Sequence, residues 1–200
     1  MASSIPTAES RPSATEPARP GRAVTATAVL TALACAGFAL VNVVFEATDR
    51  FSAGPYADYA AGLAVMNWLV VGLKIVGAGM ALLSVAPERR WAPAPLLAVP
   101  LWAAFATLGV YGLGSLVQAL GLAAGITGSP DRIGAAGAAY VLFFLLSAVG
   151  FGTLALSHTR RHRVRARVAV AGSLGAPLVL GGVFMGIPGL LVALGVMPPM

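Results

Sequence analysis

Charged side chains are scarce in this sequence: Lys, Arg, Asp and Glu make up 10% of its 200 residues, whereas 58% are hydrophobic. A soluble domain usually carries about 25% charged residues, because it needs them to cover its surface. This chain has too few for a water-facing surface, and its hydrophobic residues fall in runs longer than a soluble core element requires. The composition therefore indicates one membrane domain.

Cysteine and histidine are also scarce, with one cysteine, Cys35, and two histidines, His158 and His162. A single cysteine forms no disulfide framework and no multi-cysteine metal site. The histidines are four residues apart, but no third ligand is near and the surrounding arginines would repel a cation. We interpret them as solvated loop residues. No nucleophile-elbow, phosphate-loop or dinucleotide-binding motif is present, so we predict neither an enzyme nor a bound cofactor.

The hydrophobic residues form five long runs. A helix rises about 1.5 Å per residue, so about twenty residues cross a hydrocarbon core of about 30 Å. The runs are nearly continuous rather than alternating in polarity, which favours helices over a β-barrel. We predict an all-α polytopic transmembrane helix bundle over residues 22–200. Its five spans are residues 23–45, 61–86, 96–124, 133–156 and 168–197.

Residues 1–21 differ from the rest of the chain, being rich in Ser, Ala, Pro, Thr and Glu. They bury too little surface to offset the entropy of ordering, so we expect a disordered tail. The run after this tail is longer than the apolar core of a cleaved signal peptide, which favours a retained helix. The fifth run contains seven glycines, Pro177 and Pro188. A four-span protein with a broken or re-entrant last segment is therefore the structural alternative.

Positive charge is distributed unequally between the two ends of the predicted bundle. The end that holds the tail, the second loop and the fourth loop carries ten arginines, and the other end carries only Arg50 and Arg132. Cytoplasmic loops of membrane proteins hold the excess of Lys and Arg. We therefore predict a cytoplasmic N-terminus and an extracytoplasmic C-terminus. The net charge of +6 flanks the spans, so we do not expect a nucleic-acid partner.

The fourth loop is the most basic segment, and residues 160–167 read Arg-Arg-His-Arg-Val-Arg-Ala-Arg. Such a loop orients the helices on either side of it. Each basic residue near a membrane surface also attracts anionic lipid with about 1 kcal/mol. Anionic lipid headgroups are therefore expected partners at residues 160–167.

Small residues repeat along several spans. Transmembrane helices pack where Gly, Ala, Ser and Thr let their backbones approach closely. We expect these faces to make contacts within the bundle, with homo- or hetero-oligomers as a further use. The faces are Ala28, Ala32 and Ala36 in the first span, Gly109, Gly112 and Gly114 in the third, and Gly150 and Gly152 in the fourth.

Lys74 is the only charged residue deep inside a predicted span. An ammonium near the bilayer centre costs about 2.5 to 3.5 kcal/mol on insertion scales, so we expect it to face the bundle interior. Asn67 lies two turns earlier on the same face. If the third span runs antiparallel to the second, Tyr111 comes to the level of Lys74 and Gln118 to that of Asn67. With Asn42 of the first span, these residues form a candidate polar site that opens outward; ordinary interhelical hydrogen bonding is the alternative.

Several short motifs also resemble a group of known proteins. They include Leu73-Lys74, Gly77-Ala78, Arg89-Arg90, Leu101-Trp102, Tyr111-Gly112, Ser115-Leu116-Val117-Gln118 and Leu120-Gly121. In these motifs the chain resembles small multi-pass integral membrane proteins of actinobacteria, whose activity is unknown. The resemblance implies a helical fold and a bacterial plasma membrane, and it carries over no activity and no site residue.

Two classes of function follow from these observations. The absence of reactive motifs and the many small-residue faces favour a non-catalytic membrane protein, such as an accessory or scaffolding subunit. Lys74 and the interrupted fifth run favour a small transporter or permease-like protein with a polar site around Lys74.

Overall fold

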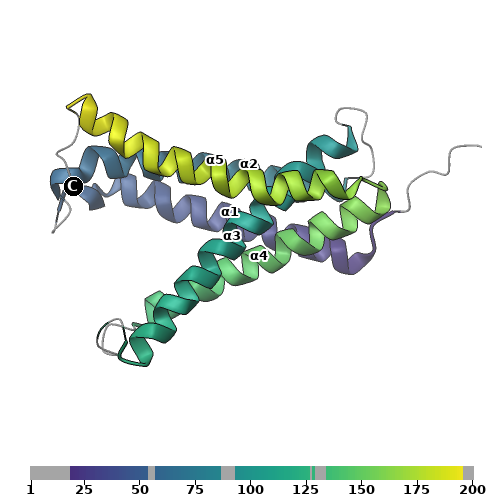
Figure 1. Ribbon diagram of the computed structural model, residues 1–200, viewed down its shortest axis with the longest axis horizontal. Helices are drawn as coiled ribbons and strands as arrows, with labels where there is room; N and C mark the ends of the chain where they lie inside the picture. The colour runs from purple at the N-terminus through teal and green to yellow at the C-terminus, as the bar shows by residue number, and fades with distance from the viewer. Residues whose placement is uncertain (1–18, 54–56, 87–92, 127, 129–133, 196–200) are drawn as a thin grey trace, which may run out of the picture.

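The computed structural model describes residues 19–53, 57–86, 93–126, 128 and 134–195, the side chains of 184 and 185 excepted. Within these ranges the chain is helical and has no β-strand. The long helices are α1 (Arg22–Ala47), α2 (Ala60–Leu83), α3 (Ala94–Ala123), α4 (Ala135–Arg161) and α5 (Ala166–Ala193). Two short 3-10 helices, η1 (Arg50–Ser52) and η2 (Ala57–Tyr59), connect α1 to α2 (Figure 1).

All five long helices are long and apolar enough to cross a membrane. The predicted all-α class with five such helices is therefore confirmed. The tail that we expect to be disordered lies outside the described residues up to position 18.

The last two helices exclude one alternative and correct one boundary of the prediction. The last helix, α5, is continuous over 28 residues and contains both Pro177 and Pro188, so the broken segment of the four-span alternative is not found. Proline is tolerated in such helices where neighbouring groups compensate for its missing amide donor. The fourth span was predicted to end at residue 156, but α4 continues to Arg161. The polar residues at its end find hydrogen-bond partners on other helices, as described below.

The helices form two groups that cross. Helix α1 packs along α2, while α3 packs against both α4 and α5, and α4 also contacts α1. In Figure 1 the pair α3 and α4 runs diagonally across α1, α2 and α5. All five helices meet at the end that holds the start of α1 and the end of α4. At the opposite end, α3 and α4 diverge from the other three.

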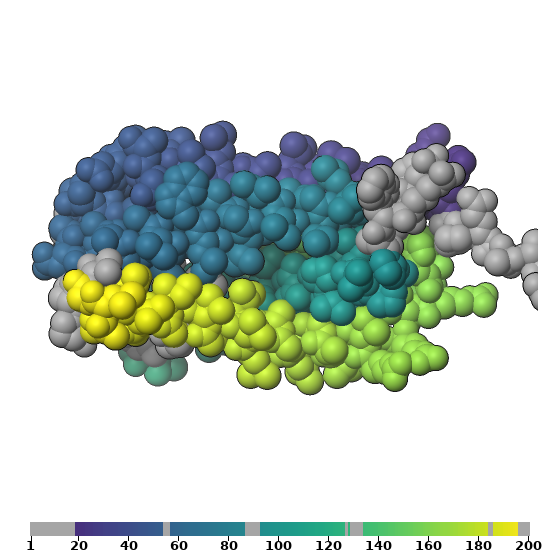
Figure 2. All heavy atoms as spheres, turned by 90° about the horizontal axis from the view of Figure 1, so that it is seen from above, coloured from purple at the N-terminus to yellow at the C-terminus, as the bar shows by residue number. Residues whose placement is uncertain are grey.

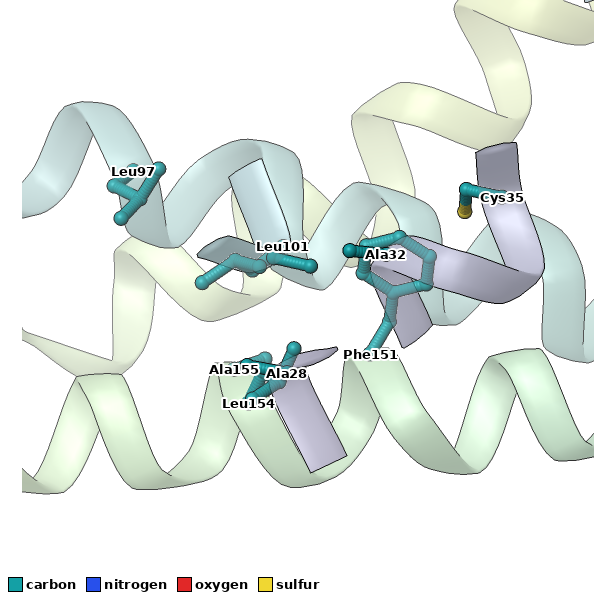
Figure 3. Close-up of a cluster of buried hydrophobic side chains, with 9 residues drawn as sticks. Ala28, Ala32, Cys35, Leu97, Leu101, Phe151, Leu154 and Ala155 are labelled. Atoms are coloured by element: carbon teal, nitrogen blue, oxygen red, sulfur yellow. The ribbon is translucent and has the colours of Figure 1, made fainter. Parts of the chain in front are cut away.

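The hydrophobic core lies at the end where the helices meet. Phe151 extends from α4 toward Ala32 and Cys35 of α1 (Figure 3). The tip of its ring is 3.3 Å from the place where a Cβ at Gly77 of α2 would lie. Four helices thus share one buried cluster, made of Ala28, Ala32, Cys35, Ala81, Leu97, Leu101, Phe151, Leu154 and Ala155.

Some of the predicted small-residue faces make the close contacts that we expect, and others do not. Ala28 and Ala32 are buried in the core, whereas Ala36 is exposed. Gly150 of α4 faces the side chain of Thr31, and a Cβ at Gly152 would lie 2.8 Å from the Phe105 ring.

The glycines of α3 also differ in whether they contact a neighbouring helix. A Cβ at Gly112 would lie 3.0 Å from the side chain of Leu145, but Gly109 and Gly114 have no neighbour within 4 Å. These two glycines do not serve packing within the chain, so this part of the prediction is wrong.

Helix α5 joins the bundle through Gly172. A Cβ at this position would lie 2.6 Å from the backbone oxygen of Val99 and 2.9 Å from Cβ of Trp102. The rest of α5 lies along the surface of the molecule, beside α2, as the space-filling view shows (Figure 2).

We expect Gly172→Ala to destabilise the protein by about 1 to 3 kcal/mol, because the added methyl group would meet the backbone of α3, which cannot rotate away. Gly181→Ala is the matched control, since position 181 has no neighbour within 4 Å. Alanine there should be neutral or stabilise α5 by up to about 1 kcal/mol through its higher helix propensity. Thermal unfolding of the detergent-solubilised protein measures both, and equal unfolding temperatures would contradict this account of α5 packing.

Candidate functional site

Lys74 faces the interior of the bundle, as predicted, where it lies between α1 and α4. Its side chain is only 8% exposed. Its Nζ atom is 4.8 Å from the ring centroid of Phe38, 5.4 Å from that of Phe143 and 5.0 Å from that of Phe144. The partners are therefore aromatic faces and not the oxygen atoms that the sequence had suggested.

The three rings account for the presence of a cation in this place. A ring face carries negative charge density, and each cation–π contact contributes about 0.5 to 2 kcal/mol depending on desolvation. Insertion of a lysine at a helix centre costs about 2.5 to 3.5 kcal/mol. Three such contacts together contribute about as much free energy as the insertion of the lysine costs. The surroundings of Lys74 are therefore compatible with its charged state.

The rings around Lys74 belong to a larger aromatic cluster of Phe38, Tyr111, Tyr140, Phe143 and Phe144. Tyr111 of α3 lies 4.6 Å from Phe144 between ring centroids, and Tyr140 of α4 lies 4.9 Å from Phe144. Tyr111 is 51% exposed and Tyr140 is 47% exposed. The cluster is therefore closed around Lys74 and open on the side of the two tyrosines.

Asn67 and Asn42 form a separate polar contact between α1 and α2. The Asn67 side chain is buried, and its Nδ2 donates to the Asn42 carbonyl oxygen at 3.0 Å and to Oε2 of Glu46 at 3.2 Å. Asn42 in turn donates to the Phe38 carbonyl at 2.7 Å. Glu46, which was not among the predicted site residues, is thus part of this contact. Ordinary interhelical hydrogen bonding describes Asn67 and Asn42 well.

Gln118 does not join either group, and its predicted place in the site is wrong. Its side chain is exposed on α3. The prediction assumed that α3 runs beside α2 along its length, whereas α3 packs mainly on α4 and α5. Toward its C-terminal end, α3 diverges from α2 (Figure 1). Tyr111 does reach the level of Lys74 along the bundle. The two residues are connected through Phe144, against which both pack.

A second polar group lies at the end where the helices meet, and the sequence interpretation missed it. His158 is fully buried, with its Nε2 atom 3.1 Å from the Ala94 carbonyl oxygen. The indole Nε1 of Trp102 donates to Oγ1 of Thr159 at 3.0 Å. The rings of His158 and His162 are 4.4 Å apart.

The interpretation of His158 as a solvated loop residue is therefore wrong. It extends the buried face of α4, on which Phe151 and Leu154 lie seven and four residues before it. This helical spacing was visible in the sequence, but the adjoining arginines suggested a loop instead.

Arg161 connects α4 to α2. Its Nη2 atom donates to the Ser84 carbonyl oxygen at 2.7 Å, and Ser84 is the C-terminal cap of α2. A cation at a helix C-terminus is favourable because the last carbonyl groups carry partial negative charge. With the contacts of His158 and Thr159, this bond ties the ends of α2, α3 and α4 together. These contacts are structural, and the described residues contain no group of three His, Cys, Asp or Glu side chains placed to hold a metal ion.

We expect Arg161→Met to lower the free energy of unfolding by about 1 to 3 kcal/mol, because it leaves the Ser84 carbonyl without its charged donor. Arg160→Met is the matched control: Arg160 is the exposed neighbour, and its loss should change stability by no more than about 0.5 kcal/mol. Unfolding of both variants in the same detergent tests this. An equal effect of the two substitutions would show that the bond to Ser84 does not stabilise the bundle.

Comparison of the chain with models of protein families, with curated proteins and with solved structures found no match.

Proposed function

We propose that this chain is a non-catalytic, multi-pass protein of a bacterial plasma membrane that serves as an accessory or scaffolding subunit, with α5 as its association surface. The observation that carries the proposal is that α5 has an apolar window of membrane-spanning length of which 0% is buried within the chain. In α1 to α4 the corresponding shares run from 17% to 39%. Helix α5 is thus the span with the fewest contacts inside the molecule.

The exposed part of α5 has the composition of a helix-packing surface. Gly175, Gly182, Gly186 and Gly189 have no neighbour within 4 Å. At 3.6 residues per turn they fall within about 60° of the helix circumference, so they share one face. Gly182 and Gly186 have the Gly-x-x-x-Gly spacing at which membrane helices approach each other closely. We call these four residues the α5 glycine face.

Contacts within the chain support this use of the α5 glycine face. Gly112, Gly150, Gly152 and Gly172 each lie against a side chain or backbone of a neighbouring helix. Close packing at glycine is therefore how this bundle is assembled. An unmatched face of the same kind, on the helix with the least burial, fits a second protein helix.

The proposed cellular location and orientation come from charge and from resemblance. The excess of arginine at one end favours a cytoplasmic position for that end. This arginine-rich end also holds the hydrophobic core and the contacts of His158 and Arg161. The diverging ends of the helices would therefore lie on the extracytoplasmic side. Arg163, Arg165 and Arg167 are exposed there and available to anionic lipid headgroups. The resemblance to actinobacterial membrane proteins supports a bacterial plasma membrane.

A small transporter or permease-like protein is the second candidate, favoured by the burial of Lys74 within the bundle. Intramembrane cations often mark the paths of substrates or ions. A polar solute retained during purification from native membranes would favour transport, whereas a stoichiometric protein subunit would favour the accessory role.

We expect Gly182→Leu combined with Gly186→Leu to separate the chain from its partner helix, because two isobutyl groups would hold the backbones apart. Gly181→Leu is the control, since Gly181 has equally open surroundings but lies on another side of α5. Native mass spectrometry of protein extracted from its own membrane should find the wild type and the control in a complex larger than 20.1 kDa, and the double variant alone. A monomeric wild type, or a double variant that keeps its complex, would contradict the proposal.

Orientation is tested with single cysteines in a Cys35→Ala background. We expect an impermeant thiol reagent to label Ala53→Cys in intact cells. It should label Arg163→Cys only after the membrane is permeabilised, because the arginine-rich end is cytoplasmic in the proposed orientation. Both positions are exposed, so access within the protein does not limit either reaction. The reverse pattern of labelling would invert the orientation.

A further inference from the structure

In its charged form, Lys74 is surrounded by the protein but not neutralised by it. Ring faces lower the energy of a cation without supplying a counter-ion. The one carboxylate on the α1–α2 contact, Glu46, is hydrogen-bonded to Asn67, which lies seven residues before Lys74 on α2. Among the described residues, the group that acts electrostatically on Lys74 is the buried thiol of Cys35, and no carboxylate does so. An ammonium whose side chain is only 8% exposed is thus left without an anion in an apolar bundle.

Two tyrosine rings adjoin one of the rings that hold this cation. Tyr111 of α3 and Tyr140 of α4 both pack against Phe144, whose ring centroid is 5.0 Å from Lys74 Nζ. Both tyrosines are about half exposed, whereas Phe144 is buried. Lys74 and the two half-exposed tyrosines thus belong to one aromatic cluster, and their ammonium and hydroxyl groups are donors suited to a negatively charged group.

We propose that Lys74, Tyr111 and Tyr140 bind the acidic headgroup, a carboxylate or a phosphate, of an amphiphile taken from the bilayer. The ligand's anion would neutralise Lys74 and accept hydrogen bonds from the two phenols. Its hydrocarbon chain would extend from the two tyrosines into the surrounding lipid.

The surroundings of the site favour this ligand over a soluble anion. Along the α1–α2 contact, the Glu46 carboxylate lies on the same side as Asn67 and would repel an anion that approached from there. The open side is that of the two tyrosines, which are about half exposed on α3 and α4. Because exposed side chains of a membrane span face lipid, the anion would arrive attached to a hydrocarbon chain.

A cationic ligand does not fit the same place. Aromatic clusters often bind ammonium groups of ligands through their ring faces. Here the ammonium of Lys74 already occupies the faces of Phe38, Phe143 and Phe144. The ammonium of Lys74 would repel a second cation that approached these rings. The cluster therefore favours a ligand of negative charge.

The test uses the full-length protein in neutral detergent and three probes with the same chain length: hexadecyl phosphate, palmitate and uncharged hexadecanol. Binding of each radiolabelled probe gives its dissociation constant. We expect the wild type to bind the two anionic probes about tenfold or more tightly than hexadecanol, since a charge-assisted contact is lost in the alcohol. Inorganic phosphate and acetate, added at millimolar concentration, should not displace them.

Substitutions of Lys74 and of the two tyrosines test whether these residues cause the preference for the anionic probes. Lys74→Met should remove the preference for the anionic probes, and Lys74→Arg should retain most of it. Tyr111→Phe with Tyr140→Phe keeps the cation and both rings, and should weaken the anionic probes about tenfold with no effect on hexadecanol. The matched control Ile75→Met changes an exposed neighbour on α2 and should bind like the wild type. Thermal unfolding of each variant checks that it is folded.

Equal binding of the charged and uncharged probes to the wild type would overturn the proposal, and so would an unchanged preference in folded Lys74→Met. Displacement of hexadecyl phosphate by inorganic phosphate would also overturn it, by showing that the site takes a soluble anion. The site lies on α2, α3 and α4, away from the α5 glycine face. Its test therefore gives the same answer whether or not α5 binds a second protein.

Discussion

Close approach of α4 to two other helices is the contact on which the rest of this bundle depends. Gly150 brings α4 against Thr31 of α1, and two residues later Gly152 brings it against Phe105 of α3. Hydrophobic burial drives helix association only weakly in lipid, so such backbone approaches determine which helices meet and at what angle. The shared core around Phe151 and Leu154 lies beside these glycines. The polar contacts of His158, Thr159 and Arg161 follow about two to three turns after these glycines on the same helix.

The two ends of the molecule have different properties because the close contacts are concentrated at one of them. Where the helices meet, small residues, a buried cluster and hydrogen bonds between α2, α3 and α4 hold the structure together. Toward the end where α3 and α4 diverge, aromatic side chains around Lys74 connect α4 with α1 and α2. This places an uncompensated cation at the border between a packed region and an open one, which is a suitable position for binding a ligand from the membrane.

Much of the fold was predictable from hydropathy, because about twenty consecutive apolar residues have few stable alternatives to a membrane helix. The error at the end of α4 has a physical cause. Histidine and arginine were taken to mark the membrane boundary, but His158 and Arg161 have hydrogen-bond acceptors on α3 and on the end of α2. A polar residue that is paired in this way can continue a helix, and its partner is far away in the sequence.

The sequence alone determined that the chain forms long apolar helices and that Lys74 faces inward, since both follow from the cost of leaving polar groups in lipid. Only the tertiary structure decided what Lys74 meets. Phe38, Phe143 and Phe144 come from α1 and α4, and they converge because α4 crosses α1 at Gly150. The same crossing carries the C-terminal part of α3 away from α2, so that Gln118 stays exposed while Tyr111 joins the aromatic cluster. Crossing angles depend on contacts between residues distant in the chain, and hydrophobic periodicity within single helices does not encode them.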